Sequence, residues 1–158
     1  MSIALIFPGQ GSQYVGMAKA LAETEPIAAE TLALADEVLG FSLSKLMADG
    51  PEDELTATEN AQPAILAHSI AVLRVMEERL GRVTFSAGHS LGEFSAHVAA
   101  GTFSFSDALK IVRLRGELMR AAGARIPGTM AAILGLSDQV VADVCAGVTT
   151  GTCVPANF

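Results

Sequence analysis

Ser90, in the segment Gly88-His89-Ser90-Leu91-Gly92, is the residue of this 158-residue chain best placed for nucleophilic chemistry. The GxSxG spacing is typical of a tight turn between a strand and a helix, which raises a serine hydroxyl above the end of the strand. Alternating apolar residues precede the turn, and residues 91–100 have a helical composition. The pattern alone also fits an ordinary structural turn. With this context, it predicts Ser90 as a nucleophile.

A serine that attacks an acyl group needs hydrogen-bond donors for the oxyanion that forms. The backbone amide of Leu91 follows the serine directly, at the start of the expected helix, where donors for an anion gather. The polar loop after the first apolar segment carries Gln10, whose side-chain amide could be a second donor. A glutamine here also fits a plain surface loop, so both interpretations of Gln10 stay open.

The proton acceptor that a serine nucleophile needs is harder to find, because the chain has only three histidines. A rise of about 1.5 Å per residue puts His97 about 10 Å along the helix axis from Ser90. His89 adjoins Ser90 in the turn, where neighbouring side chains diverge, and His68 lies in an apolar helical segment. We interpret all three as structural, and the sequence predicts no general base in this chain.

Arg115 lies on a predicted helix over 107–121, capped by Ser106, in the middle of an apolar face. That face holds Ala108, Ile111, Val112, Leu118, Met119 and Ala122, and the opposite side holds Lys110, Arg113, Glu117 and Arg120. An arginine on an apolar face needs an anionic partner, and its planar fork suits a carboxylate. An internal salt bridge and a clamp for a substrate carboxylate both satisfy this requirement.

The elements that must position these residues alternate between strand and helix. The apolar run over 3–7 predicts a buried strand, residues 83–87 predict a second strand that leads to Ser90, and residues 61–80 predict a long helix between them, with Pro63 in its first turn. Shorter helices are expected over 16–24 and 27–39, with a turn at Asp49-Gly50-Pro51. This order indicates an α/β fold with a parallel sheet.

Beyond residue 122 the pattern changes to that of a second, smaller α+β unit. Gly123 to Gly128 is expected to form a hinge, Thr129 to Leu134 a strand, and Ser137 to Ala146 an amphipathic helix opened by Ser137-Asp138. Cys153-Val154 begins a further predicted strand that stops at Phe158.

The composition excludes several classes of protein. The chain is 51% hydrophobic, yet no stretch approaches the length that a membrane span needs, and the apolar start is too short for a signal peptide. We therefore expect a cytoplasmic protein. The net charge of −7 and the lack of a Lys/Arg cluster argue against nucleic-acid binding. Cys145 and Cys153 lack CxxC spacing, so neither a disulfide nor a metal site is expected.

Five motifs, taken together and in order, closely resemble the bacterial malonyl-CoA:acyl carrier protein transacylase family of fatty acid synthesis. They are Phe7-Pro8-Gly9-Gln10-Gly11-Ser12-Gln13, Gln62-Pro63-Ala64, Gly88-His89-Ser90-Leu91-Gly92-Glu93, Arg113-Leu114-Arg115-Gly116 and Gly128-Thr129-Met130-Ala131-Ala132. The likeness covers the whole chain. It implies a parallel-sheet, α/β-hydrolase-like large domain, begun by residues 1–124, and an inserted ferredoxin-like α+β small domain, begun and left incomplete by residues 125–158.

The resemblance also implies a reaction. Ser90 would take malonyl from coenzyme A and hand it to the phosphopantetheine thiol of acyl carrier protein. Gln10 and the Leu91 amide would form the oxyanion hole, Arg115 would bind the malonyl carboxylate, and Gln62 would support the site. No bound cofactor is implied: malonyl-CoA is the substrate, acyl carrier protein the partner, and the full-length enzyme a monomer.

The chain departs from the family in length. Family members are longer, and their catalytic histidine lies in the part without a counterpart here, so the general base stays unknown. Phe158 falls inside a family segment, Val-Pro-Ala-Asn-Phe, and we therefore expect the N-terminal part of a longer enzyme. Two alternatives remain, namely an α/β serine hydrolase of the thioesterase kind and a non-catalytic fragment that binds coenzyme A or acyl carrier protein.

Overall fold

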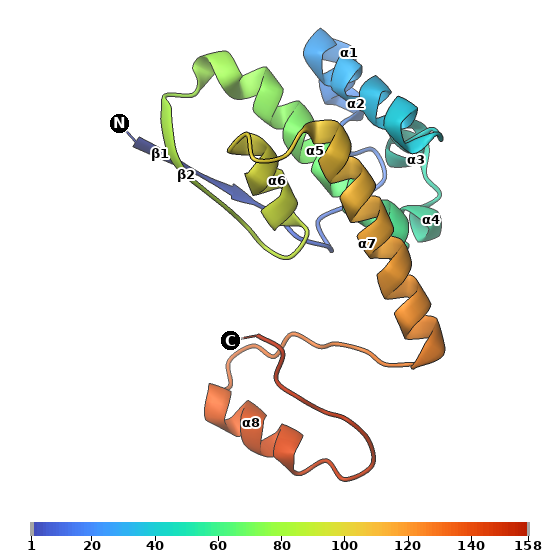
Figure 1. Ribbon diagram of the computed structural model, residues 1–158, viewed down its shortest axis with the longest axis vertical. Helices are drawn as coiled ribbons and strands as arrows, with labels where there is room; N and C mark the ends of the chain where they lie inside the picture. Colours follow the sequence, from blue (N-terminus) through green and yellow to red (C-terminus); the bar gives the residue numbers. More distant parts are fainter. Residues whose placement is uncertain (1, 158) are drawn as a thin grey trace. The chain divides into compact units, whose positions relative to one another are not determined.

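The computed structural model describes residues 2–157, which divide into two compact units with the boundary in the sequence between Ile126 and Pro127. The sheet of the first unit has two strands, β1 (Ser2–Phe7) and β2 (Arg82–Gly88), which pair in parallel with Phe7 opposite Gly88 (Figure 1). Parallel strands need a crossover connection, and here it consists of helices. The expected strands and the parallel α/β class are confirmed, with helix predominating. The expectation that the first strand is buried is wrong: only Phe7 of β1 is buried and Ile6 is 83% exposed, because the core of this unit lies between the helices.

Five α-helices and one short 3₁₀ helix fill the crossover. They are α1 (Lys19–Thr24), α2 (Pro26–Leu39), α3 (Leu43–Asp49), α4 (Glu52–Thr56), α5 (Thr58–Met76) and η1 (Glu77–Arg79). The expected turn at Asp49-Gly50-Pro51 separates α3 from α4, with Gly50 at a φ of 77°. Sequence periodicity missed α3 and α4, because helices of seven and five residues are too short to show a repeat. Within residues 2–157 no helix is long and apolar enough to cross a membrane.

The core of the first unit is built around α5, which packs against α2, α6 and α7. Its residues from Ala61 to Ala67 are all buried, so the helix has no polar face over this stretch. Fully burying one leucine or isoleucine side chain contributes roughly 1.5–3 kcal/mol, which makes α5 the main scaffold. The largest fully buried side chains include Leu43, Met47, Leu55, Ile65, Leu66, Ile70, Leu91 and Leu109.

Pro63 corrects the expected start of this helix. It lies inside α5 rather than in the first turn, because the helix begins at Thr58 and not at 61. Proline lacks a backbone N–H, so an interior proline leaves the carbonyl four residues earlier without its helical donor. In α5 that carbonyl belongs to Glu59.

The next helices are α6 (Gly92–Ala99) and α7 (Phe105–Arg125). The cap of α7 is Ser104, whose Oγ accepts from the Asp107 amide at 3.0 Å, so the prediction of Ser106 was wrong. The helix continues past Gly123, so the expected hinge at 123–128 is also wrong in its first half. The buried face of α7 runs through Ala108, Leu109, Val112 and Gly116, whereas Ile111, Leu118 and Met119 of the predicted apolar face are exposed.

The second unit contains one helix, α8 (Asp138–Ala146), capped as expected by Ser137, whose Oγ accepts from the Val140 amide. The strands expected at 129–134 and 153–154 are not formed in the described part of this unit. A strand is stabilised by pairing, and neither segment has a partner strand within residues 127–157. The cysteines are free thiols, with 3.6 Å between the sulfurs, and the hydrogen bond from Cys153 raises the pKa of Cys145.

Candidate active site

Ser90 lies at a sharp turn between β2 and α6, where its backbone has a φ of 53°. This left-handed conformation is uncommon for a residue with a Cβ, and strain of this kind is characteristic of serines at a nucleophile turn. The side chain is exposed. The strand–turn–helix context that the GxSxG segment predicted is therefore confirmed, while the nucleophilic role of Ser90 stays a prediction.

Gly88 and Gly92 flank this turn. Both positions require glycine, because backbone atoms occupy the space that a side chain would need. A Cβ on Gly88 would lie 2.0 Å from the carbonyl carbon and oxygen of Gly92, and a Cβ on Gly92 would lie 2.5 Å from the carbonyl oxygen of Phe7. The His89 amide donates to the same Phe7 carbonyl at 3.1 Å. The turn is thus held against the end of β1, and this close packing fixes the place of Ser90.

Replacing Gly92 with alanine should displace the turn, because neither the end of β1 nor the start of α6 can yield to the new methyl group. Overpacking of this kind costs about 1–3 kcal/mol, and a displacement of about 1 Å at a nucleophile lowers activity by roughly 10²-fold. Thermal unfolding and acyl-loading rates measure the two effects. Gly123→Ala is the matched control, since nothing lies within 4 Å of the Cβ it would add. An equal loss in both variants would contradict the packing argument.

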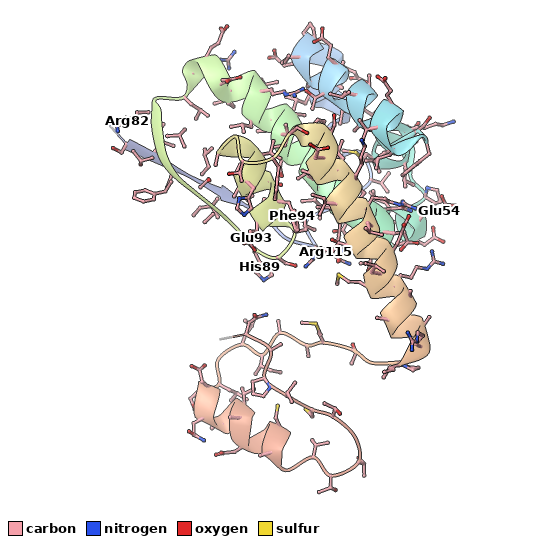
Figure 2. The ribbon with its side chains drawn as sticks, in the orientation of Figure 1. Glu54, Arg82, His89, Glu93, Phe94 and Arg115 are labelled. Atoms are coloured by element: carbon pink, nitrogen blue, oxygen red, sulfur yellow. The ribbon has the colours of Figure 1, made fainter. Side chains whose placement is uncertain are left out.

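Arg115 reaches the turn from α7 (Figure 2). Its Nη2 donates to Ser90 Oγ at 3.0 Å, and its Nη1 donates to Gln62 Oε1 at 2.6 Å. Gln62 is fully buried on α5, and its Nε2 lies 3.3 Å from the sulfur of Met119. A buried amide held on both sides has little freedom, so Gln62 orients the guanidinium toward the serine.

The charge of Arg115 is not neutralised within residues 2–157, since no carboxylate there forms an ion pair with it. Arg113 and Arg120 of the same helix each pair with a glutamate. Of the two interpretations that the sequence left open, the internal salt bridge is therefore not formed in the described residues. A half-buried guanidinium beside a serine hydroxyl suits an anionic group on a substrate.

The two expected oxyanion donors differ in their surroundings. The amide of Leu91 makes no hydrogen bond within residues 2–157, and its buried side chain anchors it. Gln10 donates from Nε2 to Thr58 Oγ1 at 3.2 Å, which leaves one amide hydrogen for another acceptor. The loop of Gln10 adjoins the turn, because a Cβ on Gly9 would lie 2.5 Å from His89 Nδ1.

The three histidines do not supply a proton acceptor in the described structure. No hydrogen bond joins any of them to Ser90 Oγ within residues 2–157, and Arg115 can only donate. His97 lies 3.9 Å from the carboxylate of Glu93, and burial lowers the pKa of His68. Across the same residues, no three His, Cys, Asp or Glu side chains gather as a metal site requires.

Sequence reasoning missed the contact between α7 and the first turn of α5. A Cβ on Gly116 would lie 2.6 Å from Glu59 Cα and 2.8 Å from the carbonyl oxygen of Thr58, so the helices touch there. A glycine inside a helical pattern beside a candidate site residue is the signal that could have revealed it. Sequence reasoning also missed that two residues of the expected polar face, Arg113 and Arg120, bond to Glu59 of α5.

The sequence of the chain also matches a known protein family. The family model described as the acyl transferase domain matches residues 4–153. This match takes in nearly the whole chain, and the chain belongs to the acyl transferase domain family.

Its relatives include the malonyl CoA-acyl carrier protein transacylase of Escherichia coli K12, which is 45% identical over 157 residues covering 98% of this chain and 51% of that protein. The enzyme of the same name from Bacillus subtilis 168 is 51% identical over 147 residues, covering 93% of this chain and 46% of that protein. The chain thus spans about half the length of the curated relatives it matches.

Solved structures agree with these relatives. The acyl-carrier-protein S-malonyltransferase of Burkholderia pseudomallei 1710b has a TM-score of 0.85 and 48% identity, with 92% of this chain and 48% of that chain covered. A malonyl-transacylase in complex with a type II PKS acyl-carrier protein has a TM-score of 0.85 and 43% identity, with 95% and 49% covered.

Proposed function

We propose that the protein carrying this chain moves malonyl from coenzyme A to the phosphopantetheine thiol of an acyl carrier protein, through an acyl-enzyme at Ser90. The observation that carries the proposal is the guanidinium of Arg115, which lies 3.0 Å from Ser90 Oγ without an acidic partner in residues 2–157. In a malonyl ester of Ser90 the free carboxylate is one methylene from the ester carbonyl, so a cation beside Oγ lies within its reach.

In the first half-reaction Ser90 Oγ attacks the thioester carbonyl of malonyl-CoA, and the C–S bond breaks as coenzyme A leaves. The Leu91 amide and Gln10 stabilise the oxyanion, each donor contributing on the order of 2.7–4 kcal/mol. In the second half-reaction the carrier-protein thiol attacks the malonyl-serine ester and restores the hydroxyl. Arg115 holds the malonyl carboxylate in both steps, with Gln62 orienting it. No cofactor takes part.

The reaction needs an acceptor for the Ser90 proton, and none of residues 2–157 is assigned this role. The family resemblance implies a histidine from the part of the family sequence that this chain does not match, and the proposal takes the base from there. It also takes residues 1–124 as part of an α/β-hydrolase-like large domain, and residues 125–158 as part of an inserted ferredoxin-like domain. The enzyme is a cytoplasmic monomer. The names of the relatives and the carrier-protein complex support the transfer of malonyl to a carrier protein.

The intact mass of the purified protein, before and after brief exposure to malonyl-CoA, tests the proposal. A gain of one malonyl group, mapped by peptide mass to the segment with Ser90, supports the acyl-enzyme. An adduct that water removes as fast as a carrier protein does would favour the serine hydrolase. Binding of coenzyme A with no covalent adduct would contradict transfer and favour a non-catalytic binding fragment.

A further inference from the structure

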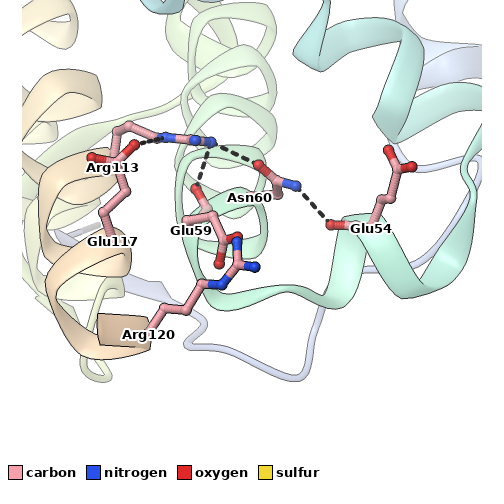
Figure 3. Close-up of polar contacts among 6 residues, drawn as sticks. All are labelled: Glu54, Glu59, Asn60, Arg113, Glu117 and Arg120. Carbon is pink, nitrogen blue, oxygen red and sulfur yellow. Dashed lines mark hydrogen bonds and ion pairs between the residues drawn. The ribbon is translucent and has the colours of Figure 1, made fainter. Parts of the chain in front are cut away.

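Pro63 leaves the Glu59 carbonyl of α5 without its helical donor, and a side chain of α7 replaces that donor (Figure 3). Arg113 Nη1 donates to the Glu59 carbonyl oxygen at 3.2 Å. A buried carbonyl without a donor costs about 1–3 kcal/mol, so the replacement matters to the packing of the two helices. The bond also joins two helices that both carry candidate site residues.

Three further contacts hold the Arg113 guanidinium in one orientation. Its Nη1 also donates to Asn60 Oδ1 at 2.7 Å, and its Nε donates to Glu117 Oε1 at 2.6 Å. The ring of Phe41 lies 5.2 Å beneath it, within the range of a cation–π contact. Asn60 is itself fixed, since its Nδ2 donates to the Glu54 carbonyl at 2.8 Å. Only a rigid fork with several donors can satisfy these partners together.

The same stretch of α7 touches the first turn of α5 at two further points. Gly116 lies against Glu59 Cα, and Arg120 Nη1 forms an ion pair with the buried carboxylate of Glu59. Residues 113, 116 and 120 share one face of a helix, so all three contacts fix the same face of α7 on α5. A slide or rotation of α7 would break them together.

The candidate site lies beside these contacts on both helices. Arg115 follows Arg113 by two residues, and Gln62 directly precedes Pro63, so the 2.6 Å bond between Arg115 and Gln62 depends on the register of α7 along α5. The 3.0 Å contact between Arg115 and Ser90 depends on it as well. Neither Arg113 nor Glu59 touches Ser90 among the described contacts, so any effect on the reaction must act through Arg115.

We propose that Arg113 is a positioning residue: by replacing the hydrogen bond that Pro63 removes from Glu59, it fixes the register of α7 on α5 and thereby places Arg115 beside Ser90. The positioning role rests on the proposed function. The hydrogen bond from Arg113 to the Glu59 carbonyl, which we call the Arg113 clamp, does not depend on the proposed function.

A double-mutant cycle between Arg113 and Pro63 tests the clamp. Pro63→Ala gives α5 its own N–H for the Glu59 carbonyl, so in that background Arg113 is no longer needed as the donor to this carbonyl. We expect Arg113→Gln to lower the unfolding temperature by about 5 °C in the original sequence, and by less than about 2 °C beside Pro63→Ala. Equal shifts in the two backgrounds would overturn the clamp, whether or not the protein transfers acyl groups.

Acyl-group selectivity tests the positioning role. Arg113→Gln should lower the ratio of malonyl to acetyl loading of Ser90 by about tenfold, and by less than about threefold beside Pro63→Ala. A merely structural defect would slow both acyl groups alike and leave the ratio unchanged. Lys110→Gln removes an exposed charge from the same helix and should leave the ratio as it is.

If Arg113→Gln does not fold, Arg113→Lys gives the same comparison, because a single ammonium cannot bond to Glu59, Asn60 and Glu117 together. An unchanged ratio in a protein that loads malonyl overturns the positioning role and leaves the proposed function standing. A protein that never gains malonyl overturns the proposed function and the positioning role with it.

Discussion

Replacing Ser90 with alanine should abolish the malonyl adduct and lower transfer by on the order of 10⁴-fold or more, the scale expected when a nucleophile is removed from a catalytic unit. The reason is chemical: of the two residues that bond to the Arg115 guanidinium in the described structure, Gln62 and Ser90, only Ser90 has a hydroxyl that can form a malonyl ester. Intact mass detects the adduct, and the transfer of radiolabelled malonyl to a carrier protein gives the rate.

Ser106→Ala is the matched control for this experiment. Ser106 lies on α7 and caps no helix, so its loss should leave both adduct and rate unchanged. Persistence of a malonyl adduct in Ser90→Ala would mean that another nucleophile accepts the acyl group. The proposed mechanism would then be wrong even if transfer continued.

Replacing Arg115 with alanine should lower malonyl loading by about 10³-fold while changing acetyl loading by less than about tenfold. Removing one partner of a buried, hydrogen-bonded charge pair costs 2–5 kcal/mol or more, and only malonyl has a carboxylate that forms such a pair. The loss should appear mainly in KM, because the arginine contacts the carboxylate both in the bound substrate and in the transition state. Loading rates with the two acyl-CoA substrates measure the selectivity directly.

Arg115→Lys separates charge from geometry. Lysine keeps the charge but not the fork that bonds to Gln62 and Ser90 together, so it should recover only part of the malonyl rate. A uniform loss for malonyl and acetyl in Arg115→Ala would show that the arginine supports the site without binding the carboxylate.

Much of the local structure could be predicted from the sequence. The alternation of apolar residues before Gly88 predicted β2, and the GxSxG spacing predicted the turn that gives Ser90 its positive φ. The cap Ser137 predicted the start of α8. These features depend on φ/ψ preferences and side-chain periodicity over a few residues, which neighbouring residues along the chain decide.

Other features could not be predicted in this way. Whether 129–134 forms a strand depends on a partner strand, and none is present within residues 127–157. The start of α5 was misplaced because Pro63 is tolerated inside the helix. Arg113, which is distant in the sequence but lies on the neighbouring helix α7, donates to the Glu59 carbonyl in place of the N–H that proline lacks. Periodicity also placed Arg113 on the side opposite the apolar face. It could not show that this side contacts α5, because periodicity gives the composition of a helix face and not what that face packs against.

The sequence by itself determined the turn that carries Ser90, the strands on either side of the helical crossover, and membership of the acyl transferase domain family. Only the tertiary structure decided what Arg115 bonds to. Its partners, Gln62 and Ser90, are 53 and 25 residues away. They meet it because α7 packs on α5 at Gly116, and because the turn with Ser90 is held against the end of β1 at Gly92. Local preferences act over about one helical turn, whereas contacts across such separations depend on how whole helices pack.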